Sequence, residues 1–264
     1  MAKVIGICNQ KGGVGKTTTV FSMGRALVDK GFKVLLIDVD DSGNPTLSKI
    51  SGVEDEKNLT DLLLLTAMGR DIEEELKTVI KKHKEGMDII PSDNKLNGVT
   101  TYLASQQESD ISRLALKTVV NKLKDKYDYI LLDAAPTINI MSVNLMTAAQ
   151  EIIIVTQPQG ASAEGIVELI KNVSSVKNTT NPQIVIRGLL ITMLDRRTNY
   201  NTEMADILTK RYTDLGMKVF NTKIPRAVSV ESCVEAHESL LAYDPTSKPA
   251  VAYRKFVEEY LQEA

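Results

Sequence analysis

Two lysines flank a glycine-rich turn close to the start of the chain, in the stretch NQKGGVGKTTT over residues 9–19. Its end, Gly15, Lys16 and Thr17, matches a phosphate loop of the G-x-x-x-x-G-K-[ST] type. In such a loop backbone amides surround a phosphate, the lysine reaches the terminal phosphates and the hydroxyl binds Mg²⁺. One lysine is enough for that chemistry, so Lys11 needs a separate explanation.

The surroundings of the turn support a nucleotide site. A strand is predicted at 3–8 and a helix at 16–30, so the glycines lie where a strand ends and a helix begins. Amides at the positive end of that helix would converge on a phosphate, and glycine is needed because a side chain would block the approach. The alternative is a glycine turn without a ligand. The expected phosphate-binding residues are Lys11, Gly12, Gly13, Val14, Gly15, Lys16, Thr17 and Thr18.

Carboxylates follow two other predicted strands. Asp38 ends KVLLID and Asp133 ends YDYILLD, so both are expected at the carboxyl edge of a parallel sheet, where ligands collect. Helix capping is the alternative for either residue alone. Asp40 would point the same way as Asp38 and could orient a water for attack on a γ-phosphate. Asp41 is expected to be solvated.

Short apolar runs alternate with helical stretches along the whole chain. Most runs are too continuously apolar to have a wet face, which predicts a parallel sheet covered by helices on both sides. The fold class is therefore α/β, a single doubly wound domain over residues 1–264. Strands are expected at 3–8, 33–38, 87–91, 127–133, 151–157, 184–193 and 218–225. Helices are expected at 16–30, 112–126, 142–149, 163–177, 201–215 and 247–262, and the polar stretch 52–58 is expected to be a surface loop.

Composition limits the class of protein. The chain has 264 residues, of which 43% are apolar and 25% charged, and its net charge of −2 argues against a uniformly basic nucleic-acid binder. Cys8 and Cys233 are too few for a disulfide framework. No signal peptide is recognisable, and the longest apolar runs reach only about eight of the ~20 residues that span a bilayer. A cytoplasmic protein is expected.

Six ordered motifs resemble the ParA/Soj deviant-Walker ATPases that partition plasmids and chromosomes. They are KGGVGKTT, LIDVDDSGN, YDYILLDAAP, TMLDRRTN, IPRAVSVESC and LLAYDPTSKPAVAYRKFVEEY, and the similarity runs from residue 3 to about 262. The resemblance implies that Lys11 is the signature lysine, which reaches the partner's phosphates across an ATP-bound homodimer. A second cation delivered in this way would stabilise a transferring phosphoryl group as an arginine finger does.

The resemblance also implies roles for other residues. Lys11, Lys16 and Asp40 would be catalytic, with ATP as substrate, and Thr17, Asp38 and Asp133 would serve Mg²⁺, the two aspartates through water. The stretch after Asp133, shaped by Pro136, is similar to switch II. Adenine would be framed by Thr192, Pro225 and Arg226, although Thr192 fits ordinary strand packing equally well.

Two segments that resemble switch I and switch II of the family differ from the usual family sequence. The aspartate-proline-glutamine run usual after the second strand is Asp40-Asp41-Ser42 here, which favours a less rigid, more acidic switch I and slow or partner-dependent hydrolysis. Many relatives have cysteine-proline-proline where this chain has 134–136, Ala-Ala-Pro. The related nitrogenase iron protein needs cluster-ligating cysteines that this chain lacks, which excludes electron transfer.

Family members of this type hold nonspecific double-stranded DNA on a basic surface. The residues expected to form it are Arg196, Arg197, Lys223 and Lys248, joined by Arg226 and Arg254. Solvation of an ordinary surface is the alternative for each. Ser229 replaces a basic residue of many relatives, and Arg187 is a candidate to compensate for it.

Three alternatives concern what the ATPase positions. A MinD-like ATPase ends in a basic amphipathic helix that enters lipid, whereas KFVEEYLQEA carries three acids against one lysine, so no membrane partner is expected. A ParA-like ATPase that positions a conjugation or chemotaxis assembly is not separable by sequence from plasmid or chromosome partition.

A ParB-like activator is the implied partner, and the ATP-bound form would be nucleoid-associated. Specific operator binding is not expected, because the first strand begins at residue 3, without a preceding helix-turn-helix.

Overall fold

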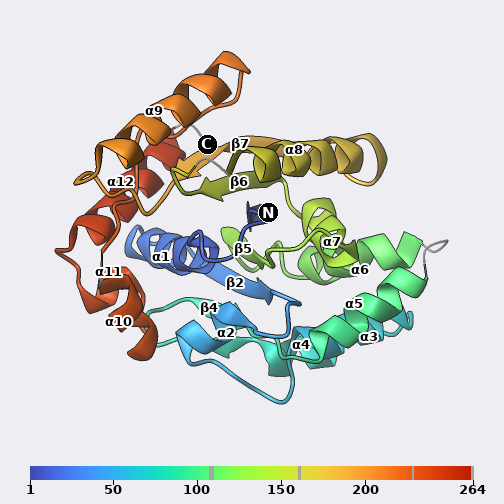
Figure 1. Cartoon of the computed structure of the whole chain (residues 1–264). Coiled ribbons are helices and arrows are strands. Elements are labelled where there is room, and N and C mark those ends of the chain that lie inside the picture. Colours follow the sequence, from blue (N-terminus) through green and yellow to red (C-terminus); the bar gives the residue numbers. More distant parts are fainter. Residues whose placement is uncertain (107–109, 160–161, 228, 263–264) are drawn as a thin grey trace.

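A seven-stranded sheet runs through the molecule in the order β3-β4-β2-β5-β1-β6-β7 (Figure 1). The computed structural model describes residues 1–106, 110–159, 162–227 and 229–262. All neighbouring strands are parallel except β3 and β4. The strands are β1 (Lys3–Cys8), β2 (Val34–Val39), β3 (Lys81–Lys82), β4 (Asp88–Ile90), β5 (Tyr129–Ala134), β6 (Glu151–Thr156) and β7 (Val185–Ile191). The predicted doubly wound α/β fold is confirmed.

Helices cover both faces of this sheet (Figure 1). The core on one face is built with α1 (Lys16–Asp29), α2 (Thr46–Ser51), α10 (Ser229–Glu235), α11 (Leu240–Tyr243) and α12 (Lys248–Gln262). The core on the other face is built with α3 (Leu59–Ala67), α4 (Glu73–Val79), α5 (Leu96–Ser105), α6 (Asp110–Asn121), α7 (Ile140–Ala148), α8 (Ser162–Thr179) and α9 (Asn199–Asp214). No described helix is both long enough and apolar enough to cross a membrane.

The central strands are buried on both faces, which explains their unbroken apolar sequences. Every residue of β2, β5 and β6 is buried. The helix that follows the glycine-rich turn packs closely on the sheet at Gly24, where an added Cβ would lie 2.8 Å from the Leu36 side chain. This close packing places the start of α1, and therefore the glycine-rich turn, against the end of β1.

The strand predicted at 218–225 is wrong. Only isolated bridges occur there, from Val219 to Leu189 and from Pro225 to Leu194. Between them the amides of Asn221 and Thr222 donate to the Glu259 carboxylate of α12, at 2.6 and 2.9 Å, so they are not available to a sheet ladder. Pro225 has no N–H to donate. The predicted helices are present within a few residues, and the loop at 52–58 is confirmed.

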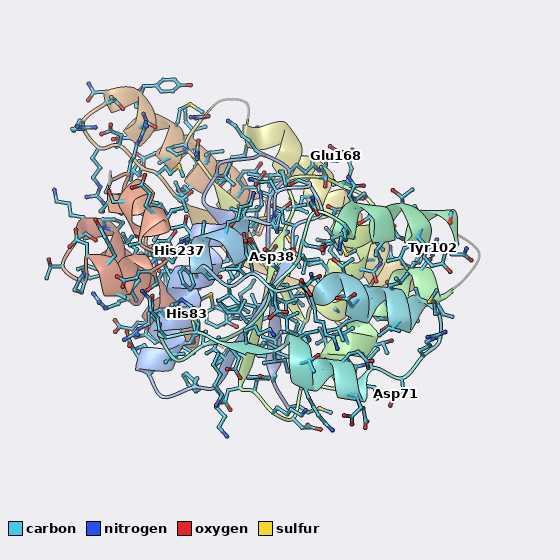
Figure 2. All side chains as sticks on the ribbon, turned by 90° about the horizontal axis from the view of Figure 1, so that it is seen from below. Asp38, Asp71, His83, Tyr102, Glu168 and His237 are labelled. Carbon is cyan, nitrogen blue, oxygen red and sulfur yellow. The ribbon has the colours of Figure 1, made fainter. Side chains whose placement is uncertain are left out.

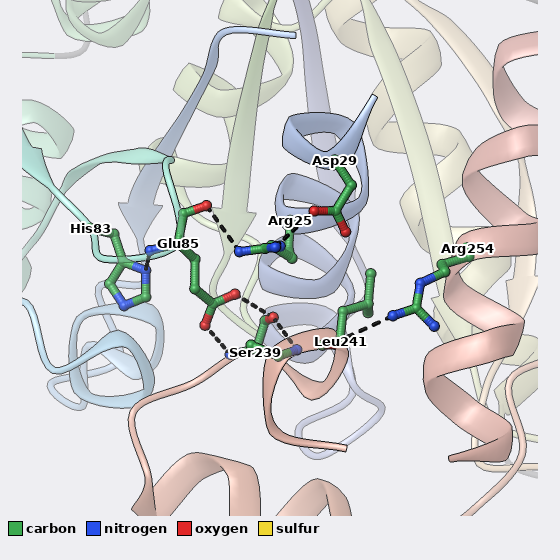
Figure 3. Close-up of polar contacts among 8 residues, drawn as sticks. Arg25, Asp29, His83, Glu85, Ser239, Leu241 and Arg254 are labelled. Carbon is green, nitrogen blue, oxygen red and sulfur yellow. Dashed lines mark hydrogen bonds and ion pairs between the residues drawn. The ribbon is translucent and has the colours of Figure 1, made fainter. Parts of the chain in front are cut away.

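Buried polar contacts fix the C-terminal segment to the β3–β4 turn (Figure 3). The Glu85 carboxylate accepts hydrogen bonds from the Ser239 amide at 2.7 Å and from the Ser239 hydroxyl at 2.5 Å. Arg25 of α1 donates to the Glu85 carbonyl, and Arg254 of α12 donates to the Leu241 carbonyl. Arg254 therefore holds α11 and α12 together.

Candidate nucleotide-binding site

The glycine-rich turn has the backbone of an anion-binding loop. Gly13 and Gly15 have φ values of 70° and 87°, in the left-handed region that side chains disfavour. Gly15 is also the N-cap of α1, where no side chain caps the first amides and no acidic residue stands in the first turn. A Cβ at Gly12 or Gly13 would meet no atom within 4 Å, so space lies in front of the loop. These amides and this space suit a phosphate.

The loop is anchored from behind by three side chains, of which Asn9 and Gln157 were not recognised in the sequence. Asn9, at the end of β1, donates to the Val155 carbonyl at 2.6 Å and accepts a hydrogen bond from the Lys11 amide at 2.8 Å. Thr192 donates to the Val14 carbonyl at 2.7 Å, and Gln157 donates to the Gly13 carbonyl at 2.7 Å. The only sequence signal for Asn9 and Gln157 is a polar side chain directly after a strand.

The two lysines of the turn lie in different environments. Lys16 is buried and its ammonium donates to the Lys11 carbonyl at 3.2 Å, so it stands inside the loop. Burial lowers the pKa of Lys16, opposed by the negative charge of Asp133. The Lys11 ammonium instead turns outward and donates to the Gln159 side chain at 2.5 Å. Lys11 lines neither cavity described next.

Two joined cavities open in front of the loop. One, of about 310 Å³, is lined by Gly12, Gly13, Gly15, Lys16, Thr17, Thr18, Asp40, Ser42, Asn44, Thr46, Ile50, Ala134, Pro136 and Met193. The other, of about 540 Å³, shares Gly13, Gly15, Thr18 and Met193 with it and extends to Thr192, Pro225, Arg226 and Tyr253. The first suits phosphates and the second a nucleoside.

Thr192 lines the larger cavity, and its hydroxyl supports the loop. Met193 beside it has φ of 51°, a left-handed conformation that costs about 1–3 kcal/mol in a residue with a side chain. Such strain is common where backbone is shaped around a ligand. The turn after β7 is therefore part of the site.

Asp38 organises the switch I segment, residues 40–46. Its carboxylate accepts hydrogen bonds from the Asp40 amide at 3.1 Å, the Ser48 amide at 2.8 Å and the Ser48 hydroxyl at 2.7 Å. Figure 2 shows Asp38 in the interior, away from the peripheral Asp71 and Tyr102. Burial raises the pKa of Asp38 to about 6. Because Ser48 lies in the first turn of α2, Asp38 also caps that helix from a distance, so the capping alternative is partly right.

Asp40 faces the phosphate cavity. It is buried, and its two carboxylate oxygens accept hydrogen bonds from the Ser42 amide at 3.0 Å and the Thr46 hydroxyl at 2.9 Å. Each oxygen keeps a second lone pair for a water donor. The Asp40 carboxylate can therefore accept a hydrogen bond from a water in that cavity.

Asp41 is not solvated, contrary to expectation. Its side chain is only 4% exposed, and one oxygen accepts a 2.7 Å hydrogen bond from the Asn139 side chain. Asp41 does not line the phosphate cavity. The residue after Asp40 therefore points to switch II, here residues 134–139, and not to the nucleotide.

Asp133 is the residue that fits a metal ion. It pairs in register with Asp38 across β5 and β2, and neither of its buried carboxylate oxygens has a hydrogen-bond partner. Burial raises the pKa of Asp133 well above its usual value, and the negative charge of Asp38 adds to this. The Thr17 hydroxyl lies close enough to Asp133 to oppose the rise in its pKa, but the two groups are not in hydrogen-bond geometry. A hard cation would relieve these charges.

The described residues hold no cluster of three His, Cys, Asp or Glu side chains that could bind a metal ion alone. Thr17, Asp38 and Asp133 offer hard oxygen donors only, so the remaining ligands must be water and phosphate oxygens, as Mg²⁺ prefers. The residues fit Mg²⁺ that arrives with a nucleotide. When bound, the ion would neutralise phosphate charge.

In nucleotide-free protein, Asp133→Asn should raise the free energy of unfolding by roughly 1–2 kcal/mol at pH 8 and by little at pH 4. The folded-state pKa of Asp133 lies above its unfolded value, so between these values the folded state binds more protons and loses stability as pH rises. Urea unfolding at both pH values measures this, with exposed Asp125→Asn as the control. An equal increase in the free energy of unfolding at pH 4 and pH 8 would contradict a raised pKa of Asp133 in the folded state.

The expected basic residues are only partly brought together. Arg196, Arg197, Arg226 and Lys248 line one cavity of about 380 Å³. Arg197 forms a two-pronged ion pair with Asp195, at 2.9 and 2.7 Å, which lowers the pKa of Asp195 to about 2.

Two other candidates lie elsewhere. Lys223 is half-buried and donates to the Phe220 carbonyl at 2.6 Å, outside that cavity. Arg187 stacks on the Tyr260 ring, 5.5 Å from its centroid, near the start of β7, and does not line that cavity. Ser229 itself begins α10.

Comparisons with known proteins agree with this geometry. The AAA domain family matches residues 2–186. The sporulation initiation inhibitor protein Soj of Bacillus subtilis is 33% identical over 260 residues, 98% of each chain. The chromosome partitioning protein ParA of Caulobacter vibrioides is 34% identical over 261 residues, 98% of this chain and 94% of ParA.

A solved structure from Mycobacterium smegmatis, described as cobyrinic acid a,c-diamide synthase with bound ADP and magnesium, superposes with a TM-score of 0.82. It is 29% identical, and the match covers 100% of this chain and 95% of that one. Taken with the phosphate loop and its paired aspartates, these matches show that the chain belongs to the ParA/MinD family of P-loop ATPases.

Proposed function

We propose that this protein is a Mg²⁺-dependent ATPase of DNA partitioning that works as a cytoplasmic switch. ATP joins two subunits face to face, the dimer binds double-stranded DNA nonspecifically and associates with the nucleoid, and hydrolysis releases it. A ParB-like DNA-binding protein stimulates slow intrinsic hydrolysis. The partitioning relatives and the joined cavities for phosphates and nucleoside support this proposal.

The position of Lys11 carries the proposal of a dimer. Its ammonium stands outside both cavities of its own subunit, held by Gln159 at the rim of the loop. A cation so placed can reach the phosphates of a facing subunit while Lys16 serves its own. The dimer would then hold two lysines for each nucleotide, which suits the charge that spreads over a transferring phosphoryl group.

The basic cavity supports the proposal of DNA binding. Four cations stand there against the single carboxylate of Asp195, although the whole chain has a net charge of −2. Within the described part of the chain, Arg196, Arg226 and Lys248 form no ion pair. Exposed cations without partners bind phosphates by releasing counterions, independently of base sequence. Arg226 also lines the nucleoside cavity, so the two sites share one segment.

Replacing Arg196 or Lys248 with alanine should weaken DNA binding by the ATP-bound dimer. Each lost phosphate contact should flatten the log–log salt dependence by about one unit. Arg197→Ala should act similarly, because its loss also leaves Asp195 unpaired near the phosphates. Binding to two unrelated duplexes across a salt series measures this, with Lys223→Ala as the control that leaves the slope unchanged. Preference for one duplex would point to operator recognition instead.

The packing of α12 argues against a membrane-positioning function. Its apolar residues Tyr253, Phe256, Val257 and Tyr260 are buried in the core shared with α1. Tyr253 also shares a 3.0 Å hydrogen bond with Thr19. An amphipathic helix binds lipid with an apolar face that is free, and in this helix that face is already packed.

A further inference from the structure

The two switch segments leave the sheet side by side. Asp38 and Asp133 are paired in register at the ends of β2 and β5, and each strand then continues into its switch segment. Three residues after Asp38 and six after Asp133, the segments meet again. There the Asn139 side-chain amide donates to the Asp41 carboxylate at 2.7 Å. No strand pairing requires this contact.

Asn139 is held so that its NH₂ group can serve Asp41. As the N-cap of α7, its side-chain oxygen accepts hydrogen bonds from the amides of Met141 at 2.9 Å and Ser142 at 3.2 Å. The amide oxygen therefore belongs to α7, and only the NH₂ group is left for switch I. The contact joins switch I directly to the first turn of a helix.

The burial of the Asp41 carboxylate at this position lowers the stability of the fold. It is 4% exposed, and its second carboxylate oxygen is buried without a partner. A buried, incompletely hydrogen-bonded carboxylate lowers stability, so an apolar side chain would serve packing better. Its neighbour Asp40 lines the phosphate cavity. The contact with Asn139 therefore fixes the backbone that carries Asp40.

We propose that Asp41 and Asn139 are a positioning pair that sets Asp40 for hydrolysis by tying switch I to α7. This proposal rests on the proposed ATPase function. It assigns Asp41 no contact with the nucleotide: the residue acts through Asp40.

Three variants separate this role from helix capping. Asn139→Ser keeps a good N-cap but is too short to reach Asp41. Asn139→Asp also caps α7 but places two carboxylates together. In the double variant Asp41→Asn with Asn139→Asp, donor and acceptor are exchanged, and the hydrogen bond can form again.

Each single variant should lower kcat for ATP by about tenfold, while KM stays within about twofold of wild type. The double variant should recover kcat to within about threefold of wild type. In nucleotide-free protein, hydrogen exchange over residues 134–139 should be faster in both single variants and restored in the double variant. Steady-state kinetics and exchange mass spectrometry measure these effects.

Single variants with wild-type kcat, or a double variant no better than Asn139→Asp, would overturn the proposal. A protein without ATPase activity even in the wild type would instead refute the proposed function. Exchange rates would then still show whether the pair orders the two switch segments.

Discussion

Lys11→Ala should retain ATP binding as a monomer but lose the ATP-dependent dimer, and its turnover should fall by about 10³-fold, as on removal of an arginine finger. Binding should survive because the loop amides, Lys16 and Thr17 stay in place. Turnover should fail because the cation outside the cavity is the one proposed to complete the facing site. Size-exclusion chromatography with and without ATP, together with phosphate release, measures both effects.

Two controls test this interpretation. Gln159→Ala removes the hydrogen-bond acceptor of Lys11 but keeps the charge, so dimer formation should persist. Lys16→Ala removes the cation inside the loop and should weaken ATP binding by the monomer itself. A normal ATP-induced dimer in Lys11→Ala would exclude a role across the subunit interface.

Asp40→Ala should trap an ATP-bound dimer on DNA, with turnover reduced by roughly 10²–10⁴-fold. The phosphate loop is untouched by this change, whereas the carboxylate that faces the phosphate cavity is lost. Single-turnover hydrolysis and DNA retention after an ATP chase measure the trap. Thr46→Val is a useful control, since it removes one donor to Asp40 and keeps the carboxylate.

Turnover near the wild-type rate in Asp40→Ala would reassign the residue that orients water. Asp41 is not a suitable replacement, because its carboxylate points to Asn139 and lies outside the phosphate cavity.

The sheet and the phosphate loop were predictable because each depends on local signals. Strands buried on both faces have continuous apolar sequences, as β2 and β5 do. The glycines mark the positions of positive φ, and lysine and threonine follow at fixed spacing. Placing Asp38 and Asp133 together needed only the rule that parallel strands end at the same edge.

Other features depend on distant side chains and had no local signal. Short helices such as α2 and α11 are too brief to show a helical period, and α2 is organised by Asp38 and Ser48. The segment 218–225 has a strand-like sequence, but Glu259 takes two of its amides. Asp41 was expected in solvent, since its partner lies 98 positions further along the chain.

The basic surface was predicted least well. Lysines and arginines are common on every surface, and sequence does not tell a paired cation from an unpaired one. Lys223 bonds its own backbone neighbour at Phe220, and Arg254 supports α11. Arg226, expected both beside adenine and on the basic surface, lines the nucleoside cavity and the basic cavity.

The most direct test is co-sedimentation of the wild-type protein with DNA in the presence of ATP and Mg²⁺, of ADP and Mg²⁺, or of no nucleotide. Parallel samples contain vesicles of anionic lipid in place of DNA. We expect the protein to bind two unrelated duplexes equally with ATP, to bind neither with ADP or without nucleotide, and not to bind vesicles. Binding that ignores the nucleotide, or ATP-dependent binding to vesicles but not to DNA, would contradict an ATP-driven DNA-partitioning switch.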